Sequence, residues 1–596
     1  MTRPTTATLR RCLAAAAAGA TALALASPAQ AQDEPPPVIE PEVVTTFDTS
    51  AAGGGARPLI GDVSGDGRLD LVMMQPHYTS DDRYEGALVA ALTAYDIEGN
   101  QLWQAGRVDP AGRNQGSDIP AQIYDIDADG RNEVVAVMHP DGDTTAEGRF
   151  HVFDGQTGEL EYDFALPDPQ AHDAIMFVNL TGNDTAQEIL LKDRYNRAWA
   201  IDARGEVLWT HEGNTGHYPW PYDFDADGSQ EIMLGYDMVD SDGEVLWTYD
   251  AGGHADSMWM ADMTGDGRPE IMLGGDAAIA FDALTGEQIW RQEDIVETQN
   301  IMTGDFIPEV EGLESLGLDR VDRTAQGYDG LFLLDSGGEF VWKEERETRG
   351  CWGSIPEPIH NWTGDYSDLI MVWNRGCDEP TTIMNGSGDT ITTLDSGARL
   401  WHADFCGDDK DEVLEYRQGV SATIKSNGEC DIDAKVTGVP LPQAKRLHNN
   451  TRYTAGDSPV DLAGDGRVTT SGALPWHRGD RAIDGDDRTA WKTLSRSEAT
   501  WQVDLGRWYT LSGVELTFPS WMCGRGAKEI GYTVEVSKDG EHWLTVVDRS
   551  EGDHDEQTQQ ARFTGLGQHV RITFTDPQRV GLHLTGLAEV EVLGHR

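Results

Sequence analysis

The sequence predicts an all-β protein in which a β-propeller of eight units is followed by a separate domain. One observation is an acidic, glycine-containing loop that recurs eight times along the chain. A second is the short apolar run that follows the well-formed copies, as expected of a buried strand. The third is that this pattern stops after Tyr453 although the chain runs to 596 residues, a length that exceeds what one hydrophobic core organises.

The first 31 residues have the pattern of a cleaved signal peptide. Arg10 and Arg11 precede an Ala/Leu-rich run at 13–26, and Ala29-Gln30-Ala31 has the small residues that signal peptidase accepts. No other stretch approaches the roughly 20 apolar residues of a membrane-spanning helix. We therefore expect a secreted or periplasmic protein with no membrane span, in which residues 32–44 are a linker.

The charge balance excludes one class of partner. The chain has 103 acidic and 45 basic residues, and its formal net charge is -58. Binding to nucleic acid requires Lys/Arg surfaces, so nucleic acid is not expected as a partner. The acidic residues could suit the surface to salty or calcium-poor surroundings, or they could be calcium ligands, and the repeated loops favour the second interpretation for many of them.

The repeated loops have the form of calcium sites. Oxygen-bearing side chains at positions 1, 3, 5 and 9 and a glycine at position 6 suit a hard cation that takes roughly six to eight oxygen ligands around a sharp turn. Position 12 is apolar, so the loop is not an EF-hand and joins two strands instead. The predicted ligands in four strong copies are Asp62, Ser64, Asp66, Asp70, Asp125, Asp127, Asp129, Glu133, Asp223, Asp225, Asp227, Glu231, Asp262, Thr264, Asp266 and Glu270. Weaker copies begin at Asn179, Asp305, Asn361 and Asp404, and the last of them adds Asp404, Asp408 and Glu412 to the predicted ligands.

Each unit has the length and pattern of one propeller blade. The loops start 39 positions apart at the closest (223 to 262) and 63 at the widest (62 to 125). A second apolar segment, a turn with glycine and often a tryptophan strand follow, as in residues 92–103, which gives four strands per unit. We predict an eight-bladed propeller over residues 45–456. Seven blades, with one unit capping or closing the ring, are the alternative. The loop ions are expected to be mainly structural.

Five cysteines follow the signal segment, and in an oxidising compartment neighbouring cysteines are expected to pair. The expected disulfides are Cys351 with Cys377 and Cys406 with Cys430, which leaves Cys523 free.

Polar residues precede the loops at positions where the innermost strands of a propeller converge on the central channel. Histidines recur there in one phase ahead of the loops, beside carboxylates. These candidates are His172, Asp173, His217, Tyr218, Trp220, His254, Asp256 and Gln299. A second cluster of Lys192, Arg194 and Tyr195 follows the strand of the third unit. Residues that line such a ring can also simply bond one another, and the second cluster could equally be a solvated loop.

The C-terminal region resembles a discoidin, or coagulation-factor C-type, domain. The resemblance lies in Ala482-Ile-Asp-Gly, Trp501-Gln-Val-Asp-Leu-Gly and the segments at 532–543 and 587–592. It implies a β-sandwich jelly roll over residues 457–596, with one calcium bound by residues including Asp487, Thr489 and Glu589. It also implies carbohydrate binding at the loop tips, where Trp521, His477 and Arg525 are candidates, although each could also be ordinary surface or packing.

The repeats resemble the FG-GAP calcium-loop repeats of integrin-type propellers. More specifically, Asp118-Ile-Pro-Ala-Gln, Lys192-Asp-Arg-Tyr, Gly216-His-Tyr-Pro-Trp and the segment at 304–314 resemble the propeller of rhamnogalacturonan lyase family eleven. This resemblance implies a polysaccharide lyase that acts on an acidic, rhamnose-containing polymer. Calcium is the expected cofactor because of the repeated loops, as several structural ions of which one could be catalytic. A propeller α-L-rhamnosidase and a non-catalytic sugar-binding or adhesion protein are the alternatives, and a monomer is expected.

β-Elimination from a uronate requires a cation for the carboxylate, a base for the proton at C5 and an acid for the leaving oxygen. We expect Arg194 or Lys192, with or without a calcium, in the first role. His217 or His254 are expected in the second role and Tyr218 or Tyr195 in the third, with His172 a further catalytic candidate. Trp220, Asp173, Asp256, Gln299 and Tyr195 are expected to contact substrate. Asp173 and Asp256 also keep a hydrolytic mechanism open.

Overall fold

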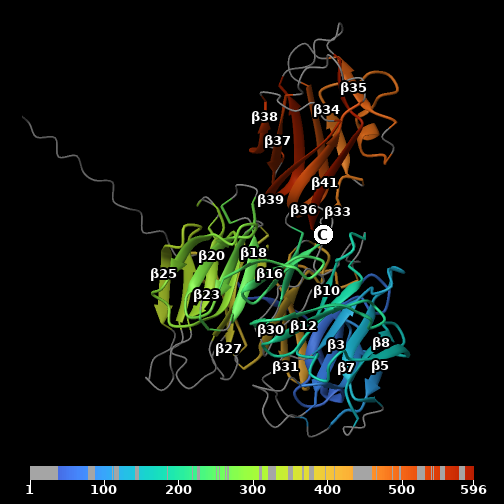
Figure 1. Ribbon diagram of the computed structural model, residues 1–596, viewed down its shortest axis with the longest axis vertical. Helices are drawn as coiled ribbons and strands as arrows, with labels where there is room; N and C mark the ends of the chain where they lie inside the picture. The colour runs from blue at the N-terminus through green and yellow to red at the C-terminus, as the bar shows by residue number, and fades with distance from the viewer. Residues whose placement is uncertain are drawn as a thin grey trace, which may run out of the picture. The chain divides into compact units, whose positions relative to one another are not determined.

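The computed structural model describes residues 38–595 with internal gaps (Figure 1). Outside the described residues lie 1–37, 78–86, 110–111, 113–119, 141–145, 184–185, 218, 224–228, 250–251, 254, 262, 265–267, 308–309, 311, 320–329, 346–353, 365–367, 375–380, 396, 409, 434–459, 465, 486–487, 495–498, 520–530, 539, 541, 551–556, 576–583 and 596.

The described residues are organised almost entirely in antiparallel β-sheets, which confirms the predicted all-β class. Short 3₁₀ turns lie at Ser50–Ala52 (η1) and Gly479–Ala482 (η4). In the part of the chain that is described, no helix is long and apolar enough to cross a membrane.

The first two units share an eight-stranded sheet, because a parallel bridge joins Val89 to Met138. Its strands are β2 (Arg57–Gly61), β3 (Asp70–Pro76), β4 (Val89–Tyr95), β5 (Gln101–Gly106), β6 (Ala121–Tyr124), β7 (Glu133–Met138), β8 (Arg149–Asp154) and β9 (Leu160–Ala165).

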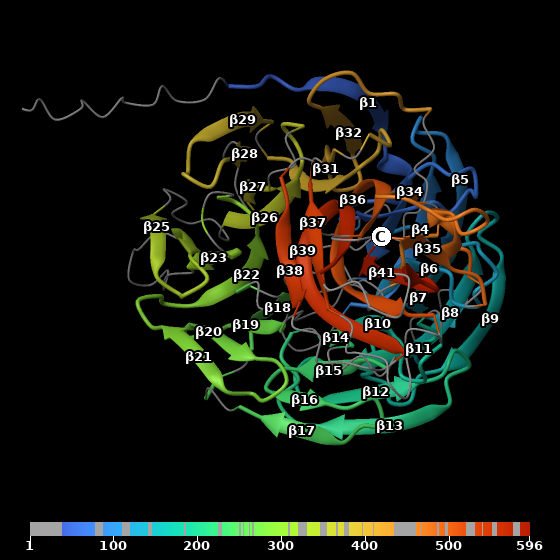
Figure 2. The ribbon, with the colours of Figure 1, turned by 90° about the horizontal axis from the view of Figure 1, so that it is seen from above.

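The next five units are separate four-stranded sheets whose strands pair in chain order, as Figure 2 shows for β14 to β17. They are β10 (Ala174–Val178), β11 (Glu188–Lys192), β12 (Arg197–Ile201) and β13 (Val207–Glu212); β14 (Trp220–Tyr222), β15 (Glu231–Leu234), β16 (Asp237–Val239) and β17 (Val245–Thr248); β18 (Ser257–Ala261), β19 (Glu270–Gly274), β20 (Ala278–Asp282) and β21 (Gln288–Gln292); β22 (Thr298–Gly304), β23 (Glu314–Asp319), β24 (Gly330–Leu334) and β25 (Phe340–Glu345); and β26 (Ser354–His360), β27 (Asp368–Asn374), β28 (Thr381–Met384) and β29 (Thr390–Leu394).

The eighth unit combines strands from both ends of the repeat region. β30 (Arg399–Ala403), β31 (Glu412–Arg417) and β32 (Ser421–Ser426) are joined by β1 (Glu42–Asp48), which pairs with β32 in antiparallel register. β1 begins within the segment expected to be a linker, at 32–44, because its backbone completes this sheet. The shared apolar cluster of Phe47, Leu71, Leu414 and Ile424 packs this last sheet against the first unit.

The inner strands of the units, such as β3 and β7, are apolar because neighbouring units cover both of their faces, whereas outer strands such as β13 are largely exposed. Val135 and Phe150 of the second unit share one core cluster with Ile175 and Phe177 of the third. The segments predicted as buried strands, such as Leu71–Met74, lie in β3 and its equivalents and are buried throughout. This packing fixes the short loops at the strand ends, where the candidate site residues lie.

The C-terminal region forms its own sheets around its own core. One sheet contains β33 (Val460–Asp461), β34 (Arg467–Thr470), β36 (Ala499–Thr517), β37 (Tyr532–Ser537), β38 (Leu544–Arg549), β39 (Thr558–Phe574) and β41 (Glu589–His595), and a second pairs β35 (Trp491–Leu494) with β40 (Leu584–Leu587). Trp491, Trp501 and Val514 are fully buried in this core.

One predicted disulfide is confirmed: Cys406 and Cys430 are bonded. Cys351, Cys377 and Cys523 lie outside the described residues, as do the signal segment at 1–31 and the first part of the expected linker.

Candidate active site and metal loops

A buried cluster of charges lies where the third unit begins. Asp173 directly precedes β10 and is 1% exposed. Its Oδ1 accepts a hydrogen bond of 2.7 Å from Arg194, and its Oδ2 lies 3.4 Å from Nζ of Lys192. Burial raises the pKa of Asp173, but the positive charges of Arg194 and Lys192 outweigh that effect and hold the pKa below its ordinary value. The carboxylate is therefore ionised and bound to two cations.

Strand pairing brings these residues together. Lys192 ends β11 and faces Ala174 across the β10–β11 ladder, so it lies next to Asp173. Its ammonium also donates to the carbonyl oxygens of Asp193 and Arg194, at 2.6 and 2.8 Å. Lys192 is completely buried. Its ammonium is therefore already bound by the loop that follows its own strand.

Asp193 fixes the turn that carries Arg194 and Tyr195. Its Oδ1 accepts the backbone N–H groups of Tyr195, Asn196 and Arg197, at 2.7 to 3.2 Å. Such capping by Asp holds the loop in one shape. The sequence analysis passed over Asp193, although an Asp at the start of a turn between two strands is the signal that would have identified it.

His217 and Tyr195 lie side by side next to this cluster. Their ring centroids are 5.3 Å apart in an edge-on arrangement, and the guanidinium carbon of Arg194 is 5.6 Å from the Tyr195 ring. On the other side, Nε2 of His217 lies 3.6 Å from Oδ1 of Asp256, an ion-pair distance rather than a hydrogen bond. His217 is 2% exposed and Asp256 is also buried, whereas Tyr195 is only half-buried. Tyr195 is thus the more accessible of the two proton-carrying side chains.

The remaining described candidates lie near strand starts of the third to sixth units. Trp220, at the start of β14, is half-buried and contacts Trp259 of the next unit, with ring centroids 4.9 Å apart. Gln299, in β22, is buried, and His172 is half-buried beside Asp173. Tyr218 and His254 lie outside the described residues, as do the metal-ligand candidates Asp225, Asp227, Asp262, Asp266 and Asp487 and the tip candidates Trp521 and Arg525.

The acidic loops share one architectural rule. The carboxylate that ends each loop begins the next strand, is buried, and accepts the backbone N–H of the residue at loop position 2. This holds for Asp70 with Val63, Glu133 with Ile126, Glu188 with Leu180, Glu270 with Met263, Glu314 with Phe306 and Glu412 with Phe405. Each of these six loops is therefore closed by its own last acidic residue. Asp223 and Glu231, the first and last candidates of the fourth loop, are also buried.

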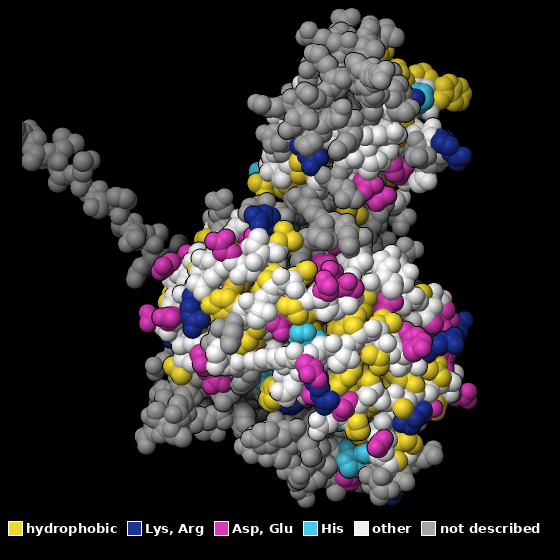
Figure 3. All heavy atoms as spheres, in the orientation of Figure 1, with side chains coloured by type: hydrophobic (Ala, Val, Ile, Leu, Met, Phe, Trp, Pro, Cys, Tyr) yellow, Lys and Arg dark blue, Asp and Glu magenta, His cyan; other side chains and the backbone are white. Residues whose placement is uncertain are grey.

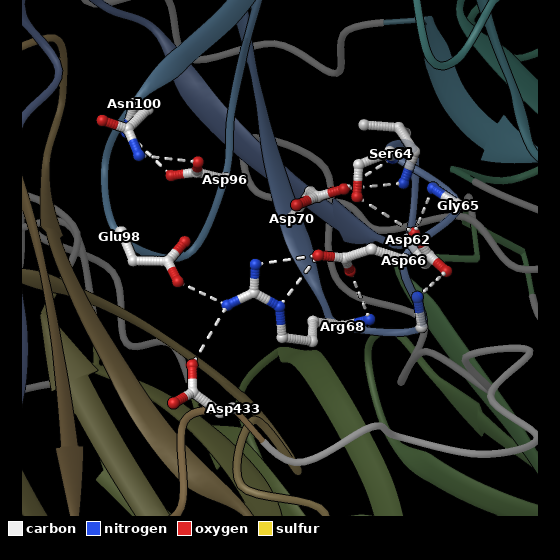
Figure 4. Close-up of polar contacts among 12 residues, drawn as sticks. Asp62, Ser64, Gly65, Asp66, Arg68, Asp70, Asp96, Glu98, Asn100 and Asp433 are labelled. Carbon is white, nitrogen blue, oxygen red and sulfur yellow. Dashed lines mark hydrogen bonds and ion pairs between the residues drawn. The ribbon is translucent and has the colours of Figure 1, made fainter.

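In the first loop a basic side chain, that of Arg68, lies among the acidic residues. Arg68 donates from Nε and one terminal nitrogen to Oδ2 of Asp66, at 2.9 and 2.8 Å, and it also pairs with Glu98. Figure 4 shows the guanidinium between these two carboxylates, with Asp433 facing the same terminal nitrogen as Glu98. Asp62 accepts the N–H groups of two loop glycines, and Ser64 donates to Oδ1 of Asp62 at 3.5 Å.

Two loops bring three carboxylates together. One oxygen each of Asp125, Asp127 and Glu133 lie within 4.8 Å of one another, and the same holds for Asp404, Asp408 and Glu412. Burial, together with the neighbouring negative charges, raises the pKa of Glu133 to about 8.

Glu412 has the same character: burial and then Asp404 and Asp408 raise its pKa to about 8. Carboxylates crowded in this way are the donor set that a hard divalent cation takes. Both clusters could hold a metal ion. The backbone N–H of Asp129 donates to Asp125 and Asp127, which places that predicted ligand beside the first cluster.

In the third loop asparagines, Asn179 and Asn183, stand at positions where other loops have aspartates. The side chain of Asn179 donates to the carbonyl of Asn183, and Asn183 in turn donates to the hydroxyl of Thr181, at 2.6 Å in both cases. Hydrogen bonds within the loop thus do part of what a cation would do. In the fifth loop Thr264 contacts Glu270 through its hydroxyl, at 3.3 Å.

The predicted calcium ligands of the C-terminal region lie close to one residue that the sequence analysis did not name. The Thr489 hydroxyl contacts both carboxylate oxygens of Asp484 at 2.9 Å, and Glu589 accepts the N–H of Gly485 at 3.2 Å. Asp484 belongs to the Ala-Ile-Asp-Gly motif, so the motif itself pointed to it. His477 is half-buried, and its Nδ1 lies 3.0 Å from the carbonyl oxygen of Ala490.

Comparison with known protein families places the repeat region and the C-terminal region separately. Residues 37–163 and 189–428, together more than half of the chain, match the C-terminal domain of rhamnogalacturonan lyase family 11. Residues 481–572 match a NedA-like, galactose-binding domain of the coagulation-factor C type. The chain is therefore a polysaccharide lyase with a carbohydrate-binding domain. It belongs to rhamnogalacturonan lyase family 11, which confirms the resemblance seen in the sequence.

Individual proteins are similar to much of this chain. The chain is 25% identical to the rhamnogalacturonan exolyase YesX of Bacillus subtilis (strain 168) over 437 residues, which cover 61% of this chain and 69% of YesX. Among solved structures, rhamnogalacturonan lyase YesW is similar at 18% identity, with a TM-score of 0.44 and coverage of 70% of this chain and 76% of that one. A rhamnogalacturonan lyase of Bacillus licheniformis gives 18% identity and a TM-score of 0.45, over 67% of this chain and 81% of the other. The family match does not favour the rhamnosidase or the adhesion alternative.

Proposed function

We propose that this lyase cleaves an acidic, rhamnose-containing polysaccharide of the rhamnogalacturonan type by β-elimination. The observation that carries the proposal is the meeting of one guanidinium, one phenol and one imidazole, from Arg194, Tyr195 and His217, beside a buried network of charges. These are the three kinds of group that elimination from a uronate requires.

In the proposed reaction Arg194 faces the uronate carboxylate and neutralises it, which makes the proton at C5 more acidic. His217 takes that proton, and the electron pair of the C5–H bond forms the C4=C5 double bond. The C4–O bond breaks, and Tyr195 gives its proton to the departing oxygen. Asp256, 3.6 Å from His217, stabilises the imidazolium that results.

Asp173 and Lys192 act in this proposal as positioning residues. Asp173 accepts a 2.7 Å hydrogen bond from Arg194 and so fixes the direction of the guanidinium. Lys192 is fully buried and bound to two carbonyl oxygens. It therefore stabilises the turn that carries Arg194 and is not the partner of the substrate carboxylate. This assignment chooses Arg194 from the two cations that the sequence left open.

Calcium is the proposed cofactor. The two clusters around Glu133 and Glu412 fit it, because each combines three carboxylates with a loop closed by backbone hydrogen bonds. Calcium there would supply positive charge that holds the loop ends, and hence the starts of β7 and β31, in place. We assign these ions a structural role.

We further propose eight blades, a propeller that runs from β1 at Glu42, ahead of the predicted start at 45, to 456, and a discoidin-like carbohydrate-binding domain over 457–596. The pairing of β1 with β32 and the packing of the eighth unit on the first support closure of eight units. Export from the cell is proposed from the signal pattern of residues 1–31 and from the extracellular location of such polymers.

The test compares matched histidine variants. His217→Gln and Tyr195→Phe should each lower turnover of rhamnogalacturonan by about 10²- to 10⁴-fold, the usual contribution of a positioned acid or base. His211→Gln is the control, since His211 pairs with Asp237 at 3.0 Å in the outer strands of the neighbouring units. Formation of product is followed by the ultraviolet absorbance of the unsaturated uronate. Full activity in both variants would refute the assignment of the site, and new reducing ends without this absorbance would refute elimination.

A further inference from the structure

The eighth unit of the repeat region differs from the others in how its two outer strands are connected. In the other units a short turn links the third strand to the fourth, as residues 96–100 link β4 to β5. In the eighth unit the third strand is β32, and the fourth is β1 from the opposite end of the repeat region (Figure 2). No turn joins them, so the edge strand β1 is tied to β32 by backbone hydrogen bonds and not by the chain.

Residues 427–433, here called the strap, follow β32 at the point where the turn would lie. Nδ2 of Asn427 donates to the carbonyl oxygen of Trp362 at 2.9 Å, which ties the strap to the seventh unit. Ile432 packs on the apolar cluster that the eighth unit shares with the first. The strap therefore contacts units on both sides of the eighth sheet.

The disulfide fixes the strap to the eighth unit itself. Cys430 on the strap is bonded to Cys406, which lies in the loop between β30 and β31. Backbone N–H groups of Phe405 and Cys406 donate to Glu412 at 2.9 and 3.0 Å, so this loop is a firm anchor. The hydroxyl of Ser426, the last residue of β32, donates to the same carboxylate at 3.1 Å. The end of β32 and the strap are thus both tied to one loop.

A charged contact of the strap is weak by comparison. Asp433 lies 3.7 Å from Arg68 of the first unit, and its side chain is 85% exposed. Exposed acidic side chains are spread over the face of the repeat region in Figure 3, and water screens ion pairs at such places. The covalent bond is therefore the contact that holds the strap most strongly.

We propose that the disulfide between Cys406 and Cys430 is a redox-sensitive latch that keeps β1 paired with β32. Cys406 is 2% exposed and Cys430 is half-buried, so a reductant can reach the bond from the side of the strap. A dithiol supplies two electrons and two protons and becomes a disulfide itself, while the bond between the two cysteines breaks and leaves two thiols. The strap is then held by noncovalent contacts alone, and the edge between β32 and β1 opens locally.

The experiment follows hydrogen exchange of the full-length protein, with calcium, by mass spectrometry. In Cys430→Ala, peptides from β1 and β32 should exchange about 10- to 100-fold faster than in the oxidised wild type, as expected if the stabilisation by the disulfide is concentrated in this sheet. Peptides from β11 and β12 should be unchanged. Asp433→Asn, which removes the exposed ion pair of the same strap, is the control and should exchange like the wild type.

Wild type treated with a dithiol should show the same local increase, and reoxidation should reverse it. This measurement decides the question if Cys430→Ala does not fold. Three results would overturn the inference: unchanged exchange in β1 and β32, an increase spread equally over all units, or a bond that a dithiol cannot reduce in the folded protein. The inference is independent of the proposed reaction, since the residues assigned to that reaction lie in the third to fifth units and failure of the reaction would leave these exchange rates as they are.

Discussion

Replacement of Asp173 by asparagine should destabilise the protein far more than the loss of an ordinary surface ion pair. Asp173 and Arg194 expose 2% and 8% of their side chains, so the pair is shielded from water, and Lys192 adds a second buried cation. Asparagine keeps the shape but removes the buried negative charge that Arg194 and Lys192 face. Breaking a buried pair in this way costs about 3 to 5 kcal/mol.

A matched control lies a few residues away. Asp168 and Arg197 make a 2.8 Å pair whose side chains are 28% and 31% exposed. Asp168→Asn should cost only about 0.2 to 1 kcal/mol, because water screens this pair. The assay is urea denaturation followed by circular dichroism at neutral pH, with the free energy of unfolding extrapolated to water.

The pH dependence gives a second readout of the same pair. The pKa of Asp173 is lower in the folded protein than its ordinary value of 3.8. Its ionised form therefore stabilises the fold above pH 3.8, and this contribution is lost as the pH falls through 3.8 towards the lower folded pKa. The difference between wild type and Asp173→Asn should narrow in that range. Equal destabilisation by Asp173→Asn and Asp168→Asn would refute the reasoning, since burial would then make no difference.

Two further perturbations test the loops. Without calcium, the raised pKa values of Glu133 and Glu412, about 8 in the folded state against 4.5 in the unfolded state, should make stability fall as the pH rises from 4.5 to 8. Added calcium should reverse that fall, and a melting temperature that is the same with chelator and with calcium across this range would contradict it. Removal of the disulfide through paired serine substitutions at Cys406 and Cys430 should cost about 3 kcal/mol, because the bond closes a loop with a sequence separation of 24. Urea denaturation of the oxidised wild type and the double variant measures this cost, and equal midpoints would show that the disulfide adds no stability.

Much of the fold could be predicted because its repeat is local. The loop at 62–70 and the apolar run after it specify a turn and a strand in one short window, and β3 lies where the run predicts it. The disulfide between Cys406 and Cys430 also spans a short stretch of sequence. By contrast, the partnership of β1 with β32 joins distant segments, and no periodicity in either segment indicates the other.

The candidate site, too, could be predicted from the sequence only in part. Asp173 and Lys192 stand at strand ends, so their meeting across the β10–β11 ladder followed from strand order. Which of the two cations is bound by backbone carbonyl groups did not, because only the folded loop brings those groups to Lys192. The exposure of Trp476 was equally hidden, since nothing in the local sequence Leu-Pro-Trp-His indicates an indole that is 91% exposed.

The pairing of β1 with β32 has a consequence for how the chain matures. During synthesis Glu42–Asp48 emerges early and its hydrogen-bonding edge has no partner until Ser421–Ser426 has been made. A strand whose edge stays unpaired for this long can form hydrogen bonds with a strand of a neighbouring molecule instead. Completion of this sheet is therefore expected to be a late, slow step in folding, and fragments that end before residue 421 should self-associate even though most of their units are complete.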